Sequence, residues 1–154
     1  MSAWEQQFKR VARALKKVEQ RKTDDEEELD DIYNFFQNCW HLKDWIKNDD
    51  GLSQEIRDAI VRDAETTESL RFCADLANGS KHLKLQKERH GAKLWHIRAI
   101  SVTDGKTGEI LSSAEIGYVI ASKDGSPTPS DLIGFSRKAV QDWKDLLAKH
   151  KLEA

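Results

Sequence analysis

The sequence predicts a mainly α-helical fold, a bundle of about four to five helices with a β-hairpin inserted before the C-terminal helix. Over most of the chain, apolar side chains recur every three to four residues, which is the period of an amphipathic helix. Between about residues 94 and 122, short β-branched runs instead flank a glycine-containing turn, a pattern typical of paired strands. A chain of 154 residues can bury one core, so residues 1–154 are expected to form a single domain.

The first helix is predicted over residues 3–21, from apolar intervals of four and three. Asp24 or Asp25 can cap a second helix, because its first turn is rich in acidic side chains. The segment NDDG, residues 48–51, ends this helix, and Ser53 opens the third. The apolar stripes of the first two helices are Trp4, Phe8, Val11, Leu15 and Val18, and then Leu29, Ile32, Phe35, Phe36, Cys39, Trp40, Leu42 and Ile46.

The last two helices flank the predicted hairpin. The segment ETTES, residues 65–69, gives a break and a new cap before a fourth helix over roughly residues 68–84. The hairpin strands are LWHIRAISV and ILSSAEIGYVIAS, joined by the turn TDGKTGE. Thr128 can cap the last helix, with Pro129 at its first position and Asp131 completing a capping box. The inner side of that helix is predicted to be Leu132, Phe135, Ala139, Val140, Trp143, Leu146 and Leu147.

Composition favours a soluble, cytoplasmic protein. Hydrophobic residues make up 38% of the chain and charged residues 34%, and no apolar run approaches the length of a membrane span. The N-terminus lacks the apolar core of a secretory signal. Cys39 and Cys73 are too few for a disulfide framework, which predicts a reducing compartment. We therefore expect no membrane partner.

Charge is distributed unevenly along the chain. The net charge of −2 does not favour RNA as a partner, because affinity for a phosphate backbone grows with excess positive charge. Residues 9–22 are nevertheless rich in Lys and Arg, whereas residues 24–31 read DDEEELDD. Acidic side chains are favoured where a helix begins, so the pattern is interpreted as two solvated helix ends of opposite charge.

The segment RFCADLANGSKHL, residues 71–83, places polar side chains on one stripe of the fourth helix. Their 4-3-4 spacing follows the helical period and points them away from the core. The four residues are Arg71, Asp75, Asn78 and His82. A solvated surface and a working face both fit this pattern. Gly79 favours the second, since glycine within a helix costs about 1 kcal/mol relative to alanine and permits close approach.

A second polar stripe lies on the second helix, away from its apolar side. It consists of Asn34, Asn38, His41 and Trp45. A tryptophan on a polar helix face often marks a contact site, so His41 and Trp45 are predicted binding residues. The alternative is that Trp45 packs under the hairpin or the last helix. Lys43 lies on the apolar side and must extend to solvent or pair.

An acid-rich helix with aromatic residues, followed by LRFCADLANGSKHL, resembles the HEPN superfamily of small helical domains. The resemblance covers roughly residues 25–85, and its closest motif is ANGSKH. Active members are metal-independent ribonucleases that act as dimers. Their signature is an arginine, a polar residue directly after it, and a histidine four to six residues beyond the arginine. Asn78 and His82 match, whereas residues 75–77 are Asp, Leu and Ala, so the arginine is absent.

The resemblance implies catalytic roles on this stripe. His82 would activate a ribose 2′-hydroxyl or protonate the leaving oxygen, and an arginine would stabilise the charge that builds on the phosphorane. Arg71 could supply that charge only in a dimer that pairs the two stripes antiparallel. The predicted catalytic residues are therefore His82, Asn78 and Arg71, with Asp75 as a binding residue beside them.

Three functions follow from these patterns. The first is a non-catalytic HEPN-like protein that acts through protein contacts, as a homodimer or with a protein partner. The resemblance implies a defence or toxin–antitoxin system for it. The second is a metal-independent ribonuclease with a rearranged His82 site, and the third is a small-molecule or nucleotide-binding module that uses Trp45 and His82. No metal site or cofactor is predicted, since Cys39 and His41 lie on different helix faces and no dinucleotide fingerprint occurs.

Overall fold

The computed structural model describes residues 1–20, 26–79, 92–96, 100–114, 118–122 and 130–153. Within these ranges the chain forms five helices, which confirms the predicted mainly helical fold. The helices are α1 (Ala3–Gln20), α2 (Glu26–Lys47), α3 (Gln54–Thr66), α4 (Glu68–Gly79) and α5 (Leu132–Lys149). Residues 80–84 of the predicted fourth helix lie outside the described residues.

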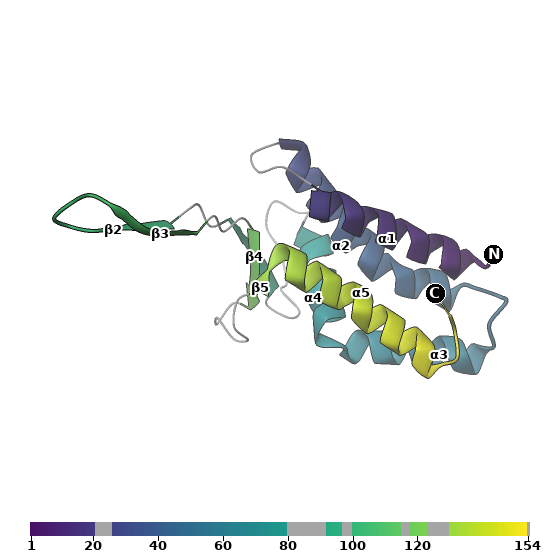
Figure 1. The fold of residues 1–154 in the computed structure, drawn as a ribbon. Helices are drawn as coiled ribbons and strands as arrows, with labels where there is room; N and C mark the ends of the chain where they lie inside the picture. Colours follow the sequence, from purple (N-terminus) through teal and green to yellow (C-terminus); the bar gives the residue numbers. More distant parts are fainter. Residues whose placement is uncertain (21–25, 80–91, 97–99, 115–117, 123–129, 154) are drawn as a thin grey trace.

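The helices form a bundle in which α1, α2, the α3–α4 pair and α5 run alternately up and down (Figure 1). α2 packs against α1, α3 and α4, and α5 closes the bundle by contacting α1, α3 and α4. α4 continues in the direction of α3 after a break at Thr67, whose N–H bonds the carbonyl oxygens of Asp63 and Ala64. Among the described residues α1 contacts neither α3 nor α4, so they lie diagonally across the bundle.

Two side chains fix where helices begin. Ser53 caps α3 as predicted, accepting a hydrogen bond from the Ile56 N–H at 3.3 Å. Asp49, in the α2–α3 turn, is buried, and its carboxylate accepts from the N–H groups of Trp4 at 3.1 Å and Gly51 at 2.9 Å. A carboxylate beside a first helical turn satisfies N–H groups that have no partner within the helix. Asp49 thus closes its own turn and holds the start of α1 against it.

The core follows the predicted apolar stripes, and every residue predicted on the inner side of the last helix is buried. Trp143 Nε1 donates a hydrogen bond to the carbonyl oxygen of Cys39 at 3.0 Å, which ties α5 to α2. The ring centroid of Phe135 lies 6.2 Å from those of both Phe36 and Phe72. Three helices, α2, α4 and α5, therefore meet in one aromatic cluster.

Two local predictions are wrong. Trp40 is half-buried at the edge of the core, and Lys43 lies over its ring with Nζ at 4.7 Å from the centroid. Lys43 is thereby paired as expected, and its Nζ also lies 3.6 Å from Glu65. The last helix begins at Leu132 rather than at Pro129, since the two residues before Leu132 form a strand.

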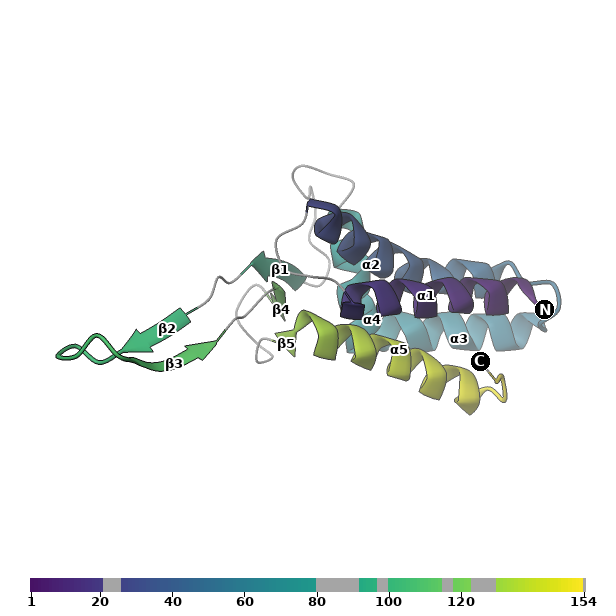
Figure 2. The same ribbon diagram turned by 45° about the horizontal axis from the view of Figure 1, so that its top comes forward.

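Short strands occupy the sequence between α4 and α5. They are β1 (Ala92–His96), β2 (Ile100–Thr103), β3 (Ile110–Ala114), β4 (Tyr118–Ser122) and β5 (Ser130–Asp131). β4 pairs antiparallel with β1 on one side and with β5 on the other. β2 pairs antiparallel with β3, and Figure 2 shows this ladder extending from one end of the bundle. Asp104 closes the β2–β3 turn by accepting from the N–H groups of Lys106 and Thr107.

One hairpin over residues 94–122 stays a prediction. The two ladders, β1–β4 and β2–β3, have the antiparallel registers that such a hairpin requires. However, residues 97–99 and 115–117, which connect the ladders, lie outside the described residues. Thr128 and Pro129, the predicted helix start, lie outside them as well.

Candidate functional site

The polar stripe of the fourth helix is partly buried. Asp75 is only 3% exposed, and Arg71 and Asn78 are half-buried. The expectation that the whole stripe points away from the core is therefore wrong at Asp75. The reason is the number of neighbours, because α4 is contacted by α2, α3, α5 and β1. His82 lies outside the described residues.

Burial of Asp75 constrains what this face can do. A carboxylate removed from water is costly unless other groups of the protein compensate it. Asp75 and Arg71 both interact with other groups of the chain, so both are engaged within the fold. Asp75 and Arg71 thus take part in contacts within the fold, whatever ligand the stripe meets.

The second predicted face, on α2, lies against α1. The Arg10 guanidinium carbon is 4.9 Å from the Trp45 ring centroid, a cation–π contact that leaves Trp45 half-buried. The contact of Trp45 that the structure describes is therefore with α1. His41, one turn earlier on α2, is also half-buried. Both predicted binding residues remain partly accessible at the α1–α2 edge.

Sequence reasoning missed Gln7, the centre of a polar network between α1 and α2. Gln7 is 2% exposed, and its Nε2 donates to both the carbonyl oxygen and Oδ1 of Asn38 at 3.1 Å. Asn38 Nδ2 donates in turn to Asn34 Oδ1 at 2.9 Å, and Arg10 donates to Gln7 Oε1 at 3.3 Å. The sequence did contain a signal for the burial of Gln7. This residue lies one helical turn after Trp4 and one before Val11, within the predicted apolar stripe.

The two faces do not converge on one site. α2 and α4 run antiparallel, and Cys39 of α2 meets Cys73 of α4 where the helices pack (Figure 1). Trp45 lies six residues beyond Cys39 and Asn78 five residues beyond Cys73, in opposite directions along the bundle. At a rise of 1.5 Å per residue, this separates them by about 16 Å along the helix axes. A single pocket built from both faces is not supported.

The two cysteines have the character of core residues. Both are fully buried. Burial, with a further contribution from the neighbouring Cys39, raises the pKa of the Cys73 thiol well above its ordinary value. A protonated thiol is a poor nucleophile and a poor metal ligand. Across the described residues, no three His, Cys, Asp or Glu side chains gather where they could hold a metal ion.

Comparisons with protein-family models, curated proteins and solved structures give no match for this chain. In the part of the chain that the structure describes, no helix combines the length and the apolar character that a membrane span requires. The chemistry of the residues above therefore carries the functional inference.

An open groove of about 370 Å³ lies between α3 and α5, away from both predicted faces. Its lining residues are Asp63, Thr66, Thr67, Asp142, Asp145, Leu146 and Lys149. Each carboxylate there already has a partner within the chain. Asp63 is bonded to Lys149 and His150, Asp142 to Lys138 and Ser69, and Asp145 to Gln141. The groove is therefore explained by contacts that join α5 to α3 and α4.

Asp63 makes the stability of this contact depend on pH. Lys149 Nζ donates to its carboxylate at 2.8 Å, and His150 Nε2 lies 2.9 Å away. Hydrogen bonds from Lys149 and then His150 hold the pKa of Asp63 below its ordinary value. Because the folded-state pKa is lowered, Asp63 stabilises the fold above its unfolded-state pKa. This contribution is lost as the pH falls through the folded-state pKa.

We expect Asp63→Asn to lower the free energy of unfolding at neutral pH by less than about 1 kcal/mol, because the ion pairs are partly exposed. At about pH 2 the difference between the variant and the natural chain should be smaller, since Asp63 becomes protonated as the pH falls through its folded-state pKa. Urea denaturation midpoints at the two pH values measure this. Asp58→Asn removes the same charge from an exposed residue bonded to Gln54 and is the control. An equal loss at both pH values would show a packing defect instead.

Proposed function

We propose that this chain is a non-catalytic HEPN-like protein that acts through protein contacts, in a system of the defence or toxin–antitoxin type. The observation that supports this most directly is the burial of Asp75. At residues 75–77, where the family signature would place its arginine, every side chain is at most 4% exposed. A carboxylic side chain cannot supply the positive charge that would stabilise a phosphorane, and the buried Leu76 and Ala77 beside it cannot either.

Arg71 is a poor substitute for the missing arginine. It is half-buried, and it already interacts within the chain. Freeing it for a ligand would break that interaction. Asn78 and His82 alone would leave a site with acid–base chemistry and no cation, and loss of one charge-stabilising donor typically costs about 10²–10³ in rate.

The proposal includes a homodimer, a cytoplasmic location, and one β-hairpin over residues 94–122 inserted before α5. Among the described residues Met1 is the one large hydrophobic residue that is exposed, and those of the helices are buried or half-buried. Contacts made through the helical faces would therefore be largely polar. Sedimentation equilibrium measures the dimer directly, and a monomer at every concentration would remove it from the proposal.

The decisive experiment is incubation of the purified chain with bulk RNA in the presence of EDTA, which silences metal-dependent contaminating nucleases. We expect no degradation above the buffer background, and the same background for His82→Ala and Asn78→Ala. His41→Ala is the matched control, a histidine on a different helix. Degradation that His82→Ala abolishes and His41→Ala retains would reject the proposal and favour the ribonuclease with a rearranged His82 site.

A further inference from the structure

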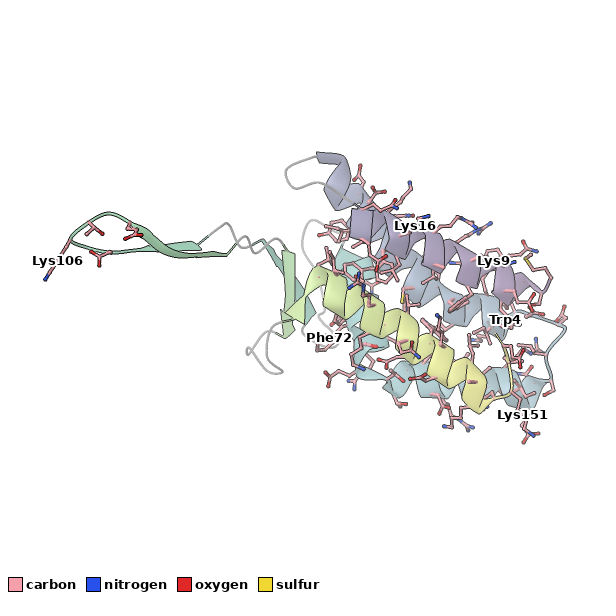
Figure 3. The ribbon with its side chains drawn as sticks, in the orientation of Figure 1. Trp4, Lys9, Lys16, Phe72, Lys106 and Lys151 are labelled. Atoms are coloured by element: carbon pink, nitrogen blue, oxygen red, sulfur yellow. The ribbon has the colours of Figure 1, made fainter. Side chains whose placement is uncertain are left out.

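The outward side of α1 carries a row of basic side chains. Lys9, Arg13 and Lys16 are exposed, and Figure 3 shows Lys9 and Lys16 directed away from the bundle. Their spacing of four and three residues keeps them on one stripe about 10 Å long. We call these three residues the α1 row. On its α2 side, Arg10 lies over Trp45 at 4.9 Å and adds a fourth cation beside a half-buried aromatic ring.

The net charge of the chain conceals a local excess of positive charge on α1. α1 carries five Lys and Arg side chains against two Glu, a net charge of +3, although the chain as a whole carries −2. α3, diagonally across the bundle, carries four Asp and Glu against two Arg, a net charge of −2. α2, which packs against α1, carries six Asp and Glu against two Lys, and five of these acids fall within residues 26–31, beside the Lys17 end of α1. Like charges four residues apart on a helix repel one another. The α1 row therefore has an electrostatic demand for an anionic partner that the net charge conceals.

That demand is unmet inside the described part of the chain. Arg13 and Lys16 make no hydrogen bond or ion pair there. Lys9 Nζ reaches only the sulfur of Met1, at 3.7 Å. By contrast, cations at the edges of α1 are paired, as Lys17 is with Asp31 at 3.6 Å. Unpaired cations concentrate in the centre of the exposed face.

The α1 row is also short, and carboxylates bound it at both ends. Glu5 precedes it, and Glu19 follows it, paired with Arg137 at 2.6 Å. Asp31 of α2 lies beside the same end, next to Lys17. A long polyanion such as a nucleic acid strand, lying along α1, would meet these carboxylates. An acidic segment of about two helical turns fits between them, with one carboxylate opposite each cation.

We infer that the α1 row is a docking surface for an acidic α-helix of a partner protein. The inference rests on the proposed function, action through protein contacts, and it names the surface and the chemistry of the partner. Carboxylates at the same four- and three-residue spacing face the row, and an apolar side chain beside them packs on Trp45. Exposed ion pairs are individually weak, so the complex is salt-sensitive and its specificity comes from spacing.

The test is an NMR titration of the ¹⁵N-labelled chain with two synthetic alanine-rich helical peptides. One carries Glu at three positions spaced by four and three residues, and the other carries Gln at the same positions. The Glu peptide is expected to shift the backbone amide signals of residues 9–17, and the Gln peptide is not. The apparent affinity should fall several-fold between about 50 and 200 mM salt, as screening shortens the range of the attraction.

Charge reversal of the α1 row should reduce the apparent affinity at least tenfold. The reversed variant combines Lys9→Glu, Arg13→Glu and Lys16→Glu. The matched control makes the same change in net charge at exposed cations elsewhere, Lys47→Glu, Arg62→Glu and Lys151→Glu, and is expected to keep the natural affinity. If the reversed variant fails to fold, glutamine at the same three positions gives the same readout with good helix propensity.

Several outcomes would overturn the inference. One is that the Gln peptide shifts the same amide signals as the Glu peptide. Another is that the matched control loses as much affinity for the Glu peptide as the reversed variant does. A single-stranded oligonucleotide of equal charge that binds the α1 row more tightly would assign it to nucleic acid. Self-association of the chain that row reversal abolishes, without peptide binding, would assign it to a second copy. Peptide binding by a chain that also cleaves RNA would keep the inference and reject the proposed function. A chain that neither binds the peptide nor cleaves RNA would reject the inference and leave the proposed function standing.

Discussion

Replacing Trp143 by alanine is expected to lower the free energy of unfolding by about 3–5 kcal/mol. The indole is fully buried, and its N–H donates to the Cys39 carbonyl oxygen at 3.0 Å. The substitution removes a large side chain of α5 at the bundle centre and the hydrogen bond that joins α5 to α2. Such a loss is a large share of the about 5–15 kcal/mol that stabilises a typical domain. The urea denaturation midpoint measures it.

Two variants separate packing from hydrogen bonding at this site. Trp143→Phe keeps most of the ring and lacks the N–H, so it should cost about 1–2 kcal/mol from the lost hydrogen bond. Trp45→Ala removes an indole that is only half-buried beneath Arg10 and should cost less than Trp143→Ala. A midpoint unchanged by Trp143→Ala would mean that α5 does not pack as described.

Asp49→Ala is expected to cost about 2 kcal/mol, the second-largest effect. The Asp49 carboxylate accepts hydrogen bonds from the N–H groups of Trp4 and Gly51 while itself only 6% exposed. Alanine leaves the Trp4 N–H without an acceptor at a buried site, whereas the N–H of the exposed Gly51 can turn to water. Thermal and urea denaturation measure the loss, and hydrogen exchange at the first turn of α1 should accelerate.

The neighbouring residue provides a control with the same change of charge. The side chain of Asp50 is fully exposed, 3.4 Å from Arg57, so Asp50→Ala should change stability by less than about 1 kcal/mol. Asp49→Asn keeps one acceptor oxygen and should fall between the two alanine variants. Equal effects of Asp49→Ala and Asp50→Ala would show that charge, and not the cap on α1, determines the result.

Apolar periodicity predicts a helix well where one side of the helix meets the core. In α5 a single stripe faces the bundle, and all of the predicted inner residues are buried. α4 has neighbours on more sides, including β1, so its polar stripe is partly covered and Asp75 is buried. The helical period gives the direction of each side chain, but the neighbours come from distant parts of the chain.

The same limit applies to the start of α5 and to the α2 face. Pro129 and its neighbours have good local chemistry for a helix start, but Ser130 and Asp131 pair with β4 instead. Trp45 stands out in its own helix, whereas Arg10, which covers it, belongs to a different helix, α1. Local preference lost to a tertiary pairing in the first case. In the second, the contact partner could not be read from spacing.

The aromatic cluster has a consequence for engineering the chain. The stacked rings of Phe72 and Phe135 hold α4 against the beginning of α5. The two helices between which all of the described strands are inserted are thus already neighbours within the bundle (Figure 1). Because the entropy of closing a connection grows slowly with its length, we expect the fold to tolerate longer insertions in this segment. A short linker in its place would remove the contacts of β1 with α4 and of β4 and β5 with α5, so the bundle should fold with a lower free energy of unfolding. A foreign domain grafted there would project from the end opposite the chain termini.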